Sequence, residues 1–202
     1  MISVNIDNMF AAGSLISRSG LVLALVFYFT ACSSIHSPGP EELARINNPP
    51  DEVVQKLEIL APLTLEWFEQ IESQYLHKGR TLTLEEQQMA RSIGVASPEK
   101  VRVIVLKHFP HPANTTLKLY TRNYGMGASS EAGRTMGNVI MLKAKRQDER
   151  ELLAYELVHI AQQEKLGRQA YVRRFITEYE LVGRDRSPLE LDAHKIALEF
   201  EQ

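Results

Sequence analysis

One stretch decides the fold of the C-terminal half of this chain: Leu152-Leu153-Ala154-Tyr155-Glu156-Leu157-Val158-His159-Ile160-Ala161-Gln162. Neither glycine nor proline interrupts it, so it favours a helix. The pattern Asp148-x-x-Glu151 is typical of a capping box, and Gly167 is a typical helix end. The spacing therefore predicts a helix of about 18 residues between these two signals.

Three side chains of this helix point to chemistry. Residues three and four apart share a helix face, so Tyr155 and His159 are expected one turn apart, with Glu156 beside them. In a His-Glu-x-x-His helix, two histidines bind zinc and the glutamate acts as the base. Glu156 and His159 stand at matching positions, and Tyr155 takes the place of the first histidine. A phenol has a pKa of about 10, so as a neutral group it is a poor zinc ligand at pH 7.

A carboxylate that completes such a site is expected on a later helix, and Glu190 is the candidate. His194 lies one turn beyond Glu190 on the same helix face and is a candidate nitrogen ligand. A structural alternative exists for Glu190. It is the fourth residue of Ser187-Pro188-Leu189-Glu190, which is itself a capping-box pattern.

The stretch 155–162 is similar to the His-Glu-Leu-x-His-x-x-Gln helix of zincin-like metallopeptidase domains, some of which belong to the core of extracellular contractile injection systems. The downstream residues resemble the Glu-x-x-Ala-Asp setting of the gluzincin branch, with Glu190 and Ala193 in place and His194 at the acidic position. The likeness covers residues 133–197. It implies a mostly helical α+β fold with a small sheet, a zinc cofactor, and a peptide or protein as substrate or partner.

Two interpretations of the site follow from the resemblance. In the first, the protein is a metallopeptidase with a rewired site, in which His159, Glu190 and His194 bind zinc and Glu156 is the catalytic base. A variant of this interpretation has Tyr155 bind the metal as a phenolate. In the second, the degenerate site is inactive, and the scaffold serves as a binding or structural module of the cell envelope.

The N-terminal sequence predicts a signal peptide and a lipid anchor. The apolar run 21–30 follows Arg18 and is too short to span a bilayer, for which about 20 apolar residues are needed. It is typical of a signal peptide covering residues 1–31. Phe29-Thr30-Ala31-Cys32 resembles a bacterial lipobox, which implies a diacylated Cys32, held by two or three acyl chains such as palmitate. Ser33 then favours the outer membrane, with the protein facing the periplasm. The alternative is a plain signal peptide or a buried apolar segment.

Composition and segment patterns complete the prediction. The net charge of −2 gives no reason to expect nucleic acid as a partner. Serine, proline and asparagine make residues 32–50 a flexible tether with at most one helical turn, and residues 51–202 form the domain. Within the domain, the predicted elements are a helix over 51–77 divided or kinked by Pro62, a helix capped by Thr83 and Glu86, strands over 101–106 and 136–142, an ambiguous segment over 116–124, and helices over 168–182 and 189–200.

Overall fold

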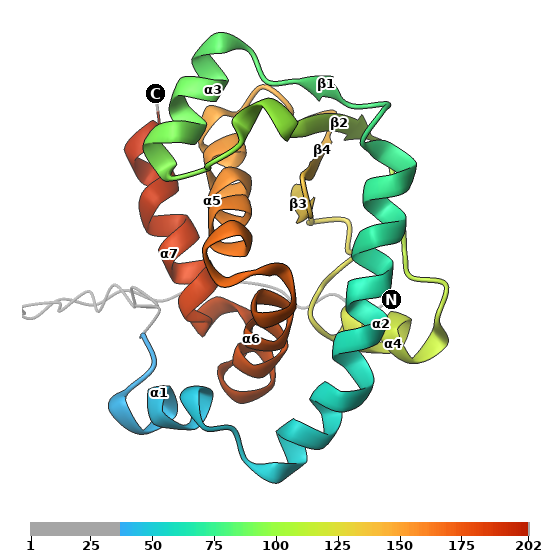
Figure 1. The fold of residues 1–202 in the computed structure, drawn as a ribbon, viewed down its shortest axis with the longest axis vertical. Coiled ribbons are helices and arrows are strands. Elements are labelled where there is room, and N and C mark those ends of the chain that lie inside the picture. The colour runs from blue at the N-terminus through green and yellow to red at the C-terminus, as the bar shows by residue number, and fades with distance from the viewer. Residues whose placement is uncertain (1–36, 202) are drawn as a thin grey trace, which may run out of the picture. The chain divides into compact units, whose positions relative to one another are not determined.

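The computed structural model describes residues 37–201. The predicted signal peptide and Cys32 lie outside the described residues. The described part holds seven α-helices and a four-stranded mixed sheet (Figure 1). The predicted fold class, a mostly helical α+β domain with a small sheet, is therefore confirmed.

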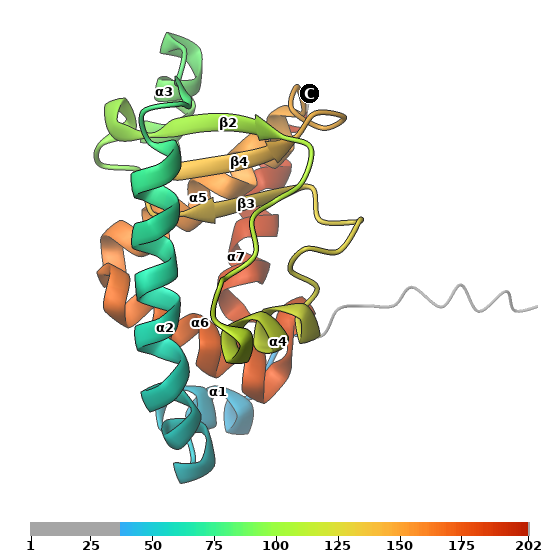
Figure 2. The ribbon, with the colours of Figure 1, turned by 90° about the vertical axis from the view of Figure 1, so that its right-hand side faces the viewer.

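The sheet has the strand order β1-β2-β4-β3, so β3 is an edge strand. Strands β2 and β4 are parallel, and the other two pairs are antiparallel; Figure 2 shows β2, β4 and β3 one below another. The strand bounds are Arg80–Thr81 for β1, Arg102–Leu106 for β2, Gly133–Met136 for β3 and Val139–Lys143 for β4. The strand predicted over 101–106 is confirmed as β2.

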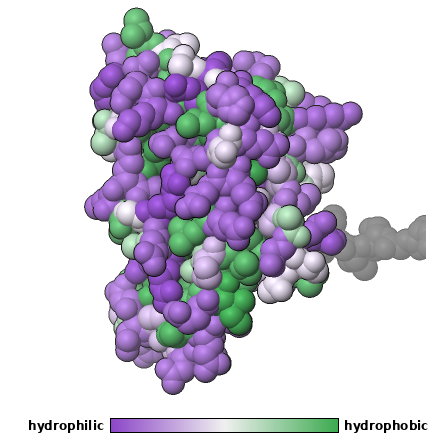
Figure 3. All heavy atoms as spheres, turned by 45° about the vertical axis from the view of Figure 1, so that its right-hand side comes forward, coloured by the Kyte–Doolittle hydropathy of each residue, from purple (hydrophilic) through white to green (hydrophobic). Residues whose placement is uncertain are grey.

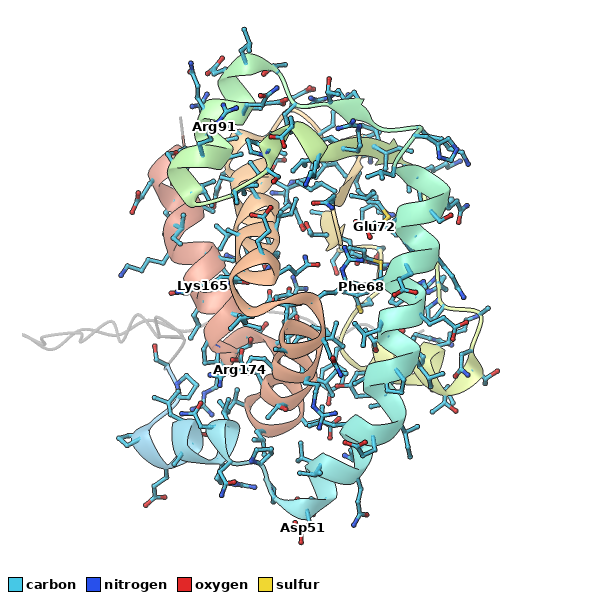
Figure 4. The ribbon with its side chains drawn as sticks, viewed as in Figure 1. Asp51, Phe68, Glu72, Arg91, Lys165 and Arg174 are labelled. Carbon is cyan, nitrogen blue, oxygen red and sulfur yellow. The ribbon has the colours of Figure 1, made fainter. Side chains whose placement is uncertain are left out.

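The single strand predicted over 136–142 is wrong, because a two-residue turn at Gly137 and Asn138 breaks it into the β3–β4 hairpin. Gly137 has a φ of 58°, which favours glycine, and a methyl group there would lie 2.7 Å from Glu72 Cγ. The Glu72 carboxylate accepts hydrogen bonds from Asn138 N at 2.7 Å and Asn138 Nδ2 at 3.1 Å. Glu72 and Phe68 lie on the side of helix α2 that faces the interior (Figure 4). A long-range contact with α2 thus fixes the turn.

The helices follow the sequence patterns at most positions. Pro62 lies inside one unbroken helix, the ambiguous segment is helical, and the capping box of Thr83 and Glu86 forms. The capping box predicted at Asp148 does not form. The N-cap residue of α5 is Glu149, and its side chain makes no capping hydrogen bond. The helix bounds are Pro40–Asn47 for α1, Asp51–Tyr75 for α2, Leu84–Ile93 for α3, Thr115–Asn123 for α4, Arg150–Leu166 for α5, Arg168–Val182 for α6 and Pro188–Ala197 for α7.

Helix α1 lies in the segment that the sequence predicts to be a tether. Its Ile46 is buried, and its Glu42 accepts a hydrogen bond from Arg186 at 2.9 Å. Asn47 accepts another from Arg174 on α6 at 2.7 Å. The turn predicted around residues 41–46 is thus a helix of residues 40–47, and one apolar side chain and two polar contacts hold it against the domain.

Strand β4 divides the core into two clusters. Ile140 and Leu142 pack against α3, α5 and α7, whereas Val139 and Met141 pack against α2 and α6. Side chains alternate between the two faces of a strand, so a strand covered on both faces is apolar at every core position. The result is a sheet with α5 on one face and α2 on the other (Figures 1 and 2).

The surface shows no single dominant feature in the view of Figure 3, where hydrophobic side chains lie in separate patches among hydrophilic ones. Large exposed apolar residues come from different elements, for example Ile59, Leu84 and Leu119. Within residues 37–201, no helix combines the length and the apolar character needed to cross a membrane.

Candidate functional site

Helix α5 carries its polar side chains into the interior. Tyr155, Glu156 and His159 are only 8%, 2% and 6% exposed. Polar groups buried to this degree destabilise the fold unless other polar groups satisfy them. The partners of these three side chains therefore define the site.

Glu156 lies against the edge strand β3. Thr135 donates a hydrogen bond from Oγ1 to Glu156 Oε2 at 2.6 Å. Gly133 allows the close approach, because a methyl group there would overlap Glu156 Oε1 and lie 3.0 Å from Cδ. Burial raises the pKa of Glu156 to about 7, although the charge of His159 and the bond from Thr135 act in the opposite direction.

Glu190 is the centre of a hydrogen-bond network. Tyr155 donates a short hydrogen bond to its Oε2, and Tyr179 donates one to its Oε1 at 2.7 Å. The Arg184 guanidinium approaches from the short turn between α6 and α7, with Nε 3.3 Å from Glu190 Oε2 and Nη2 3.5 Å from the Tyr155 hydroxyl. Both carboxylate oxygens of Glu190 are thus engaged.

This network sets the protonation of its members. Burial by itself would raise the pKa of Glu190. The charges of His159 and Arg184, with the two tyrosine hydrogen bonds, outweigh burial and lower that pKa. Burial and the charge of Glu190 raise the pKa of Tyr155 well above its usual value. In the metal-free protein, Tyr155 is therefore a protonated donor to an ionised Glu190.

His159 is oriented by its neighbours. Gln162 donates from Nε2 to the Leu189 carbonyl at 2.9 Å, so its Oε1 is left as the acceptor 2.9 Å from His159 Nδ1. This arrangement places the proton of a neutral His159 on Nδ1. The other nitrogen, Nε2, lies 3.8 Å from Glu190 Oε1. His159 and Glu190 are therefore brought together as predicted.

His194 is not brought into this group. Its exposed ring packs on Tyr155 with a centroid distance of 4.7 Å, and the His159 ring lies 4.8 Å from the same phenol. His159 and His194 border different cavities, whereas Tyr155 lines both. Among residues 37–201, no three His, Cys, Asp or Glu side chains converge in a way that could hold a metal ion.

A catalytic zinc site needs three protein ligands about 2 Å from the metal ion. Zinc bonds of about 2 Å are compatible with the 3.8 Å between His159 Nε2 and Glu190 Oε1. The third protein ligand is missing, however, because a protonated phenol stands at its position. The Arg184 guanidinium also places a positive charge next to Glu190. The residues as arranged do not fit a zinc ion.

Two cavities meet at this network and together form the cleft. The first has a volume of about 70 Å³ and aromatic walls from α2, α4 and α6: Trp67, Phe68, Tyr120, Tyr124, Tyr171, Phe175 and Tyr179. The second has a volume of about 190 Å³ and is polar, with Arg146, Glu151 and His194 among its lining residues. Gly133, Tyr155, Glu156 and Arg184 line both cavities. The edge strand β3 thus borders the first cavity through Gly133, Arg134 and Thr135, and the second through Gly133.

Several residues of the site carry no signal in the sequence. Arg184 lies in the short turn Arg184–Arg186, and Tyr179 lies in a helix whose sequence contains no functional motif. Glu178 is fully buried and accepts hydrogen bonds from Ser187 Oγ at 2.6 Å and Leu189 N at 3.0 Å. It therefore positions the start of α7, which carries Glu190.

The capping box predicted at Ser187 and Glu190 forms only in part. Ser187 accepts a hydrogen bond from Glu190 N at 3.4 Å and so caps α7. The Glu190 side chain bonds to Tyr155 and Tyr179 instead of closing the capping box.

Comparison of the chain with protein-family models, curated protein sequences and solved structures found no match. The functional argument therefore rests on this geometry and on the sequence patterns.

Proposed function

We propose that the protein is a lipid-anchored protein of the bacterial envelope with a zincin-like scaffold, whose degenerate metallopeptidase site is inactive as a hydrolase and serves as a binding cleft. One observation carries the proposal: the Tyr155 hydroxyl donates to Glu190 from the position where the motif has a metal-binding histidine. Tyr155 and Glu190, which occupy two of the predicted metal-ligand positions, thus bind each other instead of an ion.

The energetics of Glu190 support an inactive site. A buried carboxylate needs charged or hydrogen-bonding partners, and Glu190 already has Tyr155, Tyr179 and Arg184. Glu190 Oε1, the oxygen that lies near His159, already accepts from Tyr179, so a metal ion there would compete with that hydrogen bond. Each lost hydrogen bond to a charged group costs about 1.5 to 3 kcal/mol. Zinc binding would therefore begin at a disadvantage.

The edge strand supports binding of an extended peptide. Lys143 N donates a hydrogen bond to Ala132 O, so residues 132 and 143 form a hydrogen-bonded pair. Such pairs alternate with non-hydrogen-bonded pairs along β3 and β4. By that alternation, the main-chain groups of Gly133 and Thr135 point away from β4. Gly133 is partly exposed whereas Thr135 is buried, so an added strand can pair first at Gly133, and pockets beside the edge can receive its side chains. The aromatic walls of the cleft suit apolar side chains of such a peptide.

A second candidate is a working metallohydrolase of the kind that the sequence pattern predicts. Two observations favour it: the 3.8 Å separation of His159 Nε2 from Glu190 Oε1, and the pKa of about 7 for Glu156, which burial raises. A pKa near the working pH suits a general base. In this candidate, His159 and Glu190 would bind a metal ion and Glu156 would accept a proton from water.

Peptide cleavage and peptide binding separate the two candidates. The full-length protein, purified in detergent, is incubated with a peptide library with and without added zinc, beside Glu156→Gln. The binding proposal predicts that both proteins retain peptides and neither cleaves them. Cleavage by the native protein that Glu156→Gln abolishes would instead establish the hydrolase.

The anchor is tested separately. Labelling of bacterial cells with a palmitate analogue should mark the native protein, and the label should be lost in Cys32→Ser. Equal labelling of the two proteins would contradict lipidation at Cys32, and secretion of an unlabelled native protein would favour a plain signal peptide.

A further inference from the structure

We propose that Arg184 is the resident cation of this site and excludes metal ions together with Tyr155, so that zinc binding returns only when both residues are replaced. The inference rests on the proposed function, because it explains how an inactive zincin-like site is stabilised. Arg184 lies outside the sequence motif, and its role predicts that Tyr155→His by itself does not restore zinc binding.

The first step is the charge of Glu190. Its side chain is about 8% exposed, and ionised carboxylates at this depth require a compensating charge. The tyrosines that bond to it are neutral donors. Arg184, with Nε 3.3 Å from Glu190 Oε2, is a permanently charged partner. His159, at 3.8 Å, is charged only when protonated.

The second step is how the guanidinium is held. Gly183 ends α6 with a φ of 76°, and the short turn Arg184–Arg186 leads directly to the buried cap residue Ser187. Glu178 holds Ser187 Oγ at 2.6 Å. The chain is therefore fixed on both sides of Arg184, and its side chain is directed at Glu190 and the Tyr155 hydroxyl.

The third step is the effect on a metal ion. Zinc bound to Glu190 at about 2 Å would share its carboxylate with the Arg184 guanidinium, whose Nε lies 3.3 Å from Oε2. The Arg184 side chain is 45% exposed, so solvent screens part of the repulsion, but two positive charges on one buried carboxylate still repel each other. A histidine at position 155 would supply the missing nitrogen but would leave this repulsion in place.

The experiment compares four full-length proteins: the native protein, Tyr155→His, Arg184→Gln and the double variant. Zinc affinity is measured by competition with a chromophoric chelator, and the melting temperature is measured with and without zinc. We expect the double variant to bind zinc at least about a hundredfold more tightly than Tyr155→His, because the repulsion is removed. We also expect zinc to raise the melting temperature of the double variant most.

Two controls, each combined with Tyr155→His, separate charge from disruption. Arg184→Lys keeps the positive charge, so its affinity for zinc should stay low. Arg186→Gln changes a neighbouring arginine that binds Glu42 on α1, and it should leave the affinity of Tyr155→His unchanged. Equal zinc affinities for Tyr155→His and the double variant would overturn the inference. Stoichiometric zinc in the native protein would overturn the proposed function itself.

A double-mutant cycle keeps the inference testable if a variant is unstable. Arg184→Gln should lower the melting temperature of the native protein, and the loss should largely disappear when Glu190→Gln is also present, because the charge to be balanced is then gone. Additive losses from the two substitutions would show that Arg184 is not the counterion of Glu190 and would overturn the inference.

Discussion

The Tyr155 hydroxyl donates a hydrogen bond to the buried carboxylate of Glu190, a residue 35 positions further along the chain. This bond joins the middle of α5 to the first turn of α7. In a metal site these two residues would bind an ion, whereas here they satisfy each other's hydrogen-bonding groups in the interior.

Tyr155→Phe removes the donor and leaves one oxygen of Glu190 with a weaker set of partners. We expect the free energy of unfolding to fall by about 1 to 3 kcal/mol, the usual effect of a lost bond to a charged buried group. Chemical denaturation measures it. Tyr124→Phe is the matched control. A smaller loss is expected, because Tyr124 is only partly buried and Glu180, which accepts its hydrogen bond, also pairs with Lys56. Equal stability of Tyr155→Phe and the native protein would contradict the account.

Glu156 predicts a pH-dependent stability. Burial raises its pKa to about 7 from the usual 4.5, so the folded protein holds this proton more tightly than the unfolded chain does. Its contribution is therefore most favourable below pH 4.5, and is lost as the pH rises from 4.5 to 7. The difference amounts to about 3 kcal/mol.

Glu156→Gln tests this because its side chain does not titrate and still accepts from Thr135. Unfolding free energies of the two proteins are measured between pH 4.5 and 8. We expect the variant to gain stability relative to the native protein as the pH rises. Parallel pH profiles for the two proteins would show that Glu156 is not buried as described.

Gly133 should be intolerant of a side chain. The methyl group of Gly133→Ala would overlap Glu156 Oε1, so the carboxylate or the edge strand has to move. We expect a loss of about 1 to 3 kcal/mol by thermal or chemical denaturation, as for overpacked interiors. The loss should shrink in Gly133→Ala combined with Glu156→Ala, which clears the space. An undiminished loss in that pair would place the strain elsewhere.

Glu178 should be needed for the position of Glu190. It is fully buried and holds both Ser187 Oγ and Leu189 N at the start of α7. Glu178→Gln exchanges one acceptor for a donor and leaves Arg174 without its charged partner on the same helix. We expect a loss of about 3 kcal/mol in the free energy of unfolding. Glu180→Gln, on the same helix, is the control, and an equal loss there would argue against a special role for Glu178.

The site was predictable where short-range patterns determine it. Helical spacing places Tyr155, Glu156 and His159 on one buried segment, and the downstream Glu190 does meet His159 and Tyr155. Arg184 was not predictable, because nothing in a turn between two helices indicates which way its side chain points. His194 shares the helix of Glu190, but its ring packs on the Tyr155 ring at the exposed side of α7.

The fold was predictable to a similar extent. The β-branched run over 101–106 gave β2, and the Thr83 capping box gave the start of α3. The β3–β4 turn was missed because it depends on Glu72, which is distant in sequence and holds Asn138 N at 2.7 Å. Helix α1 was predicted only as one short turn, because its full length depends on contacts with Arg174 and Arg186, far along the chain.

The central claim is that Tyr155 and Arg184 take the place of a metal ion beside Glu190. The most direct test is the zinc content of the full-length native protein, purified in detergent without chelators and measured by elemental analysis. The account predicts far less than one zinc per chain. About one zinc per chain, lost in His159→Ala, would contradict it.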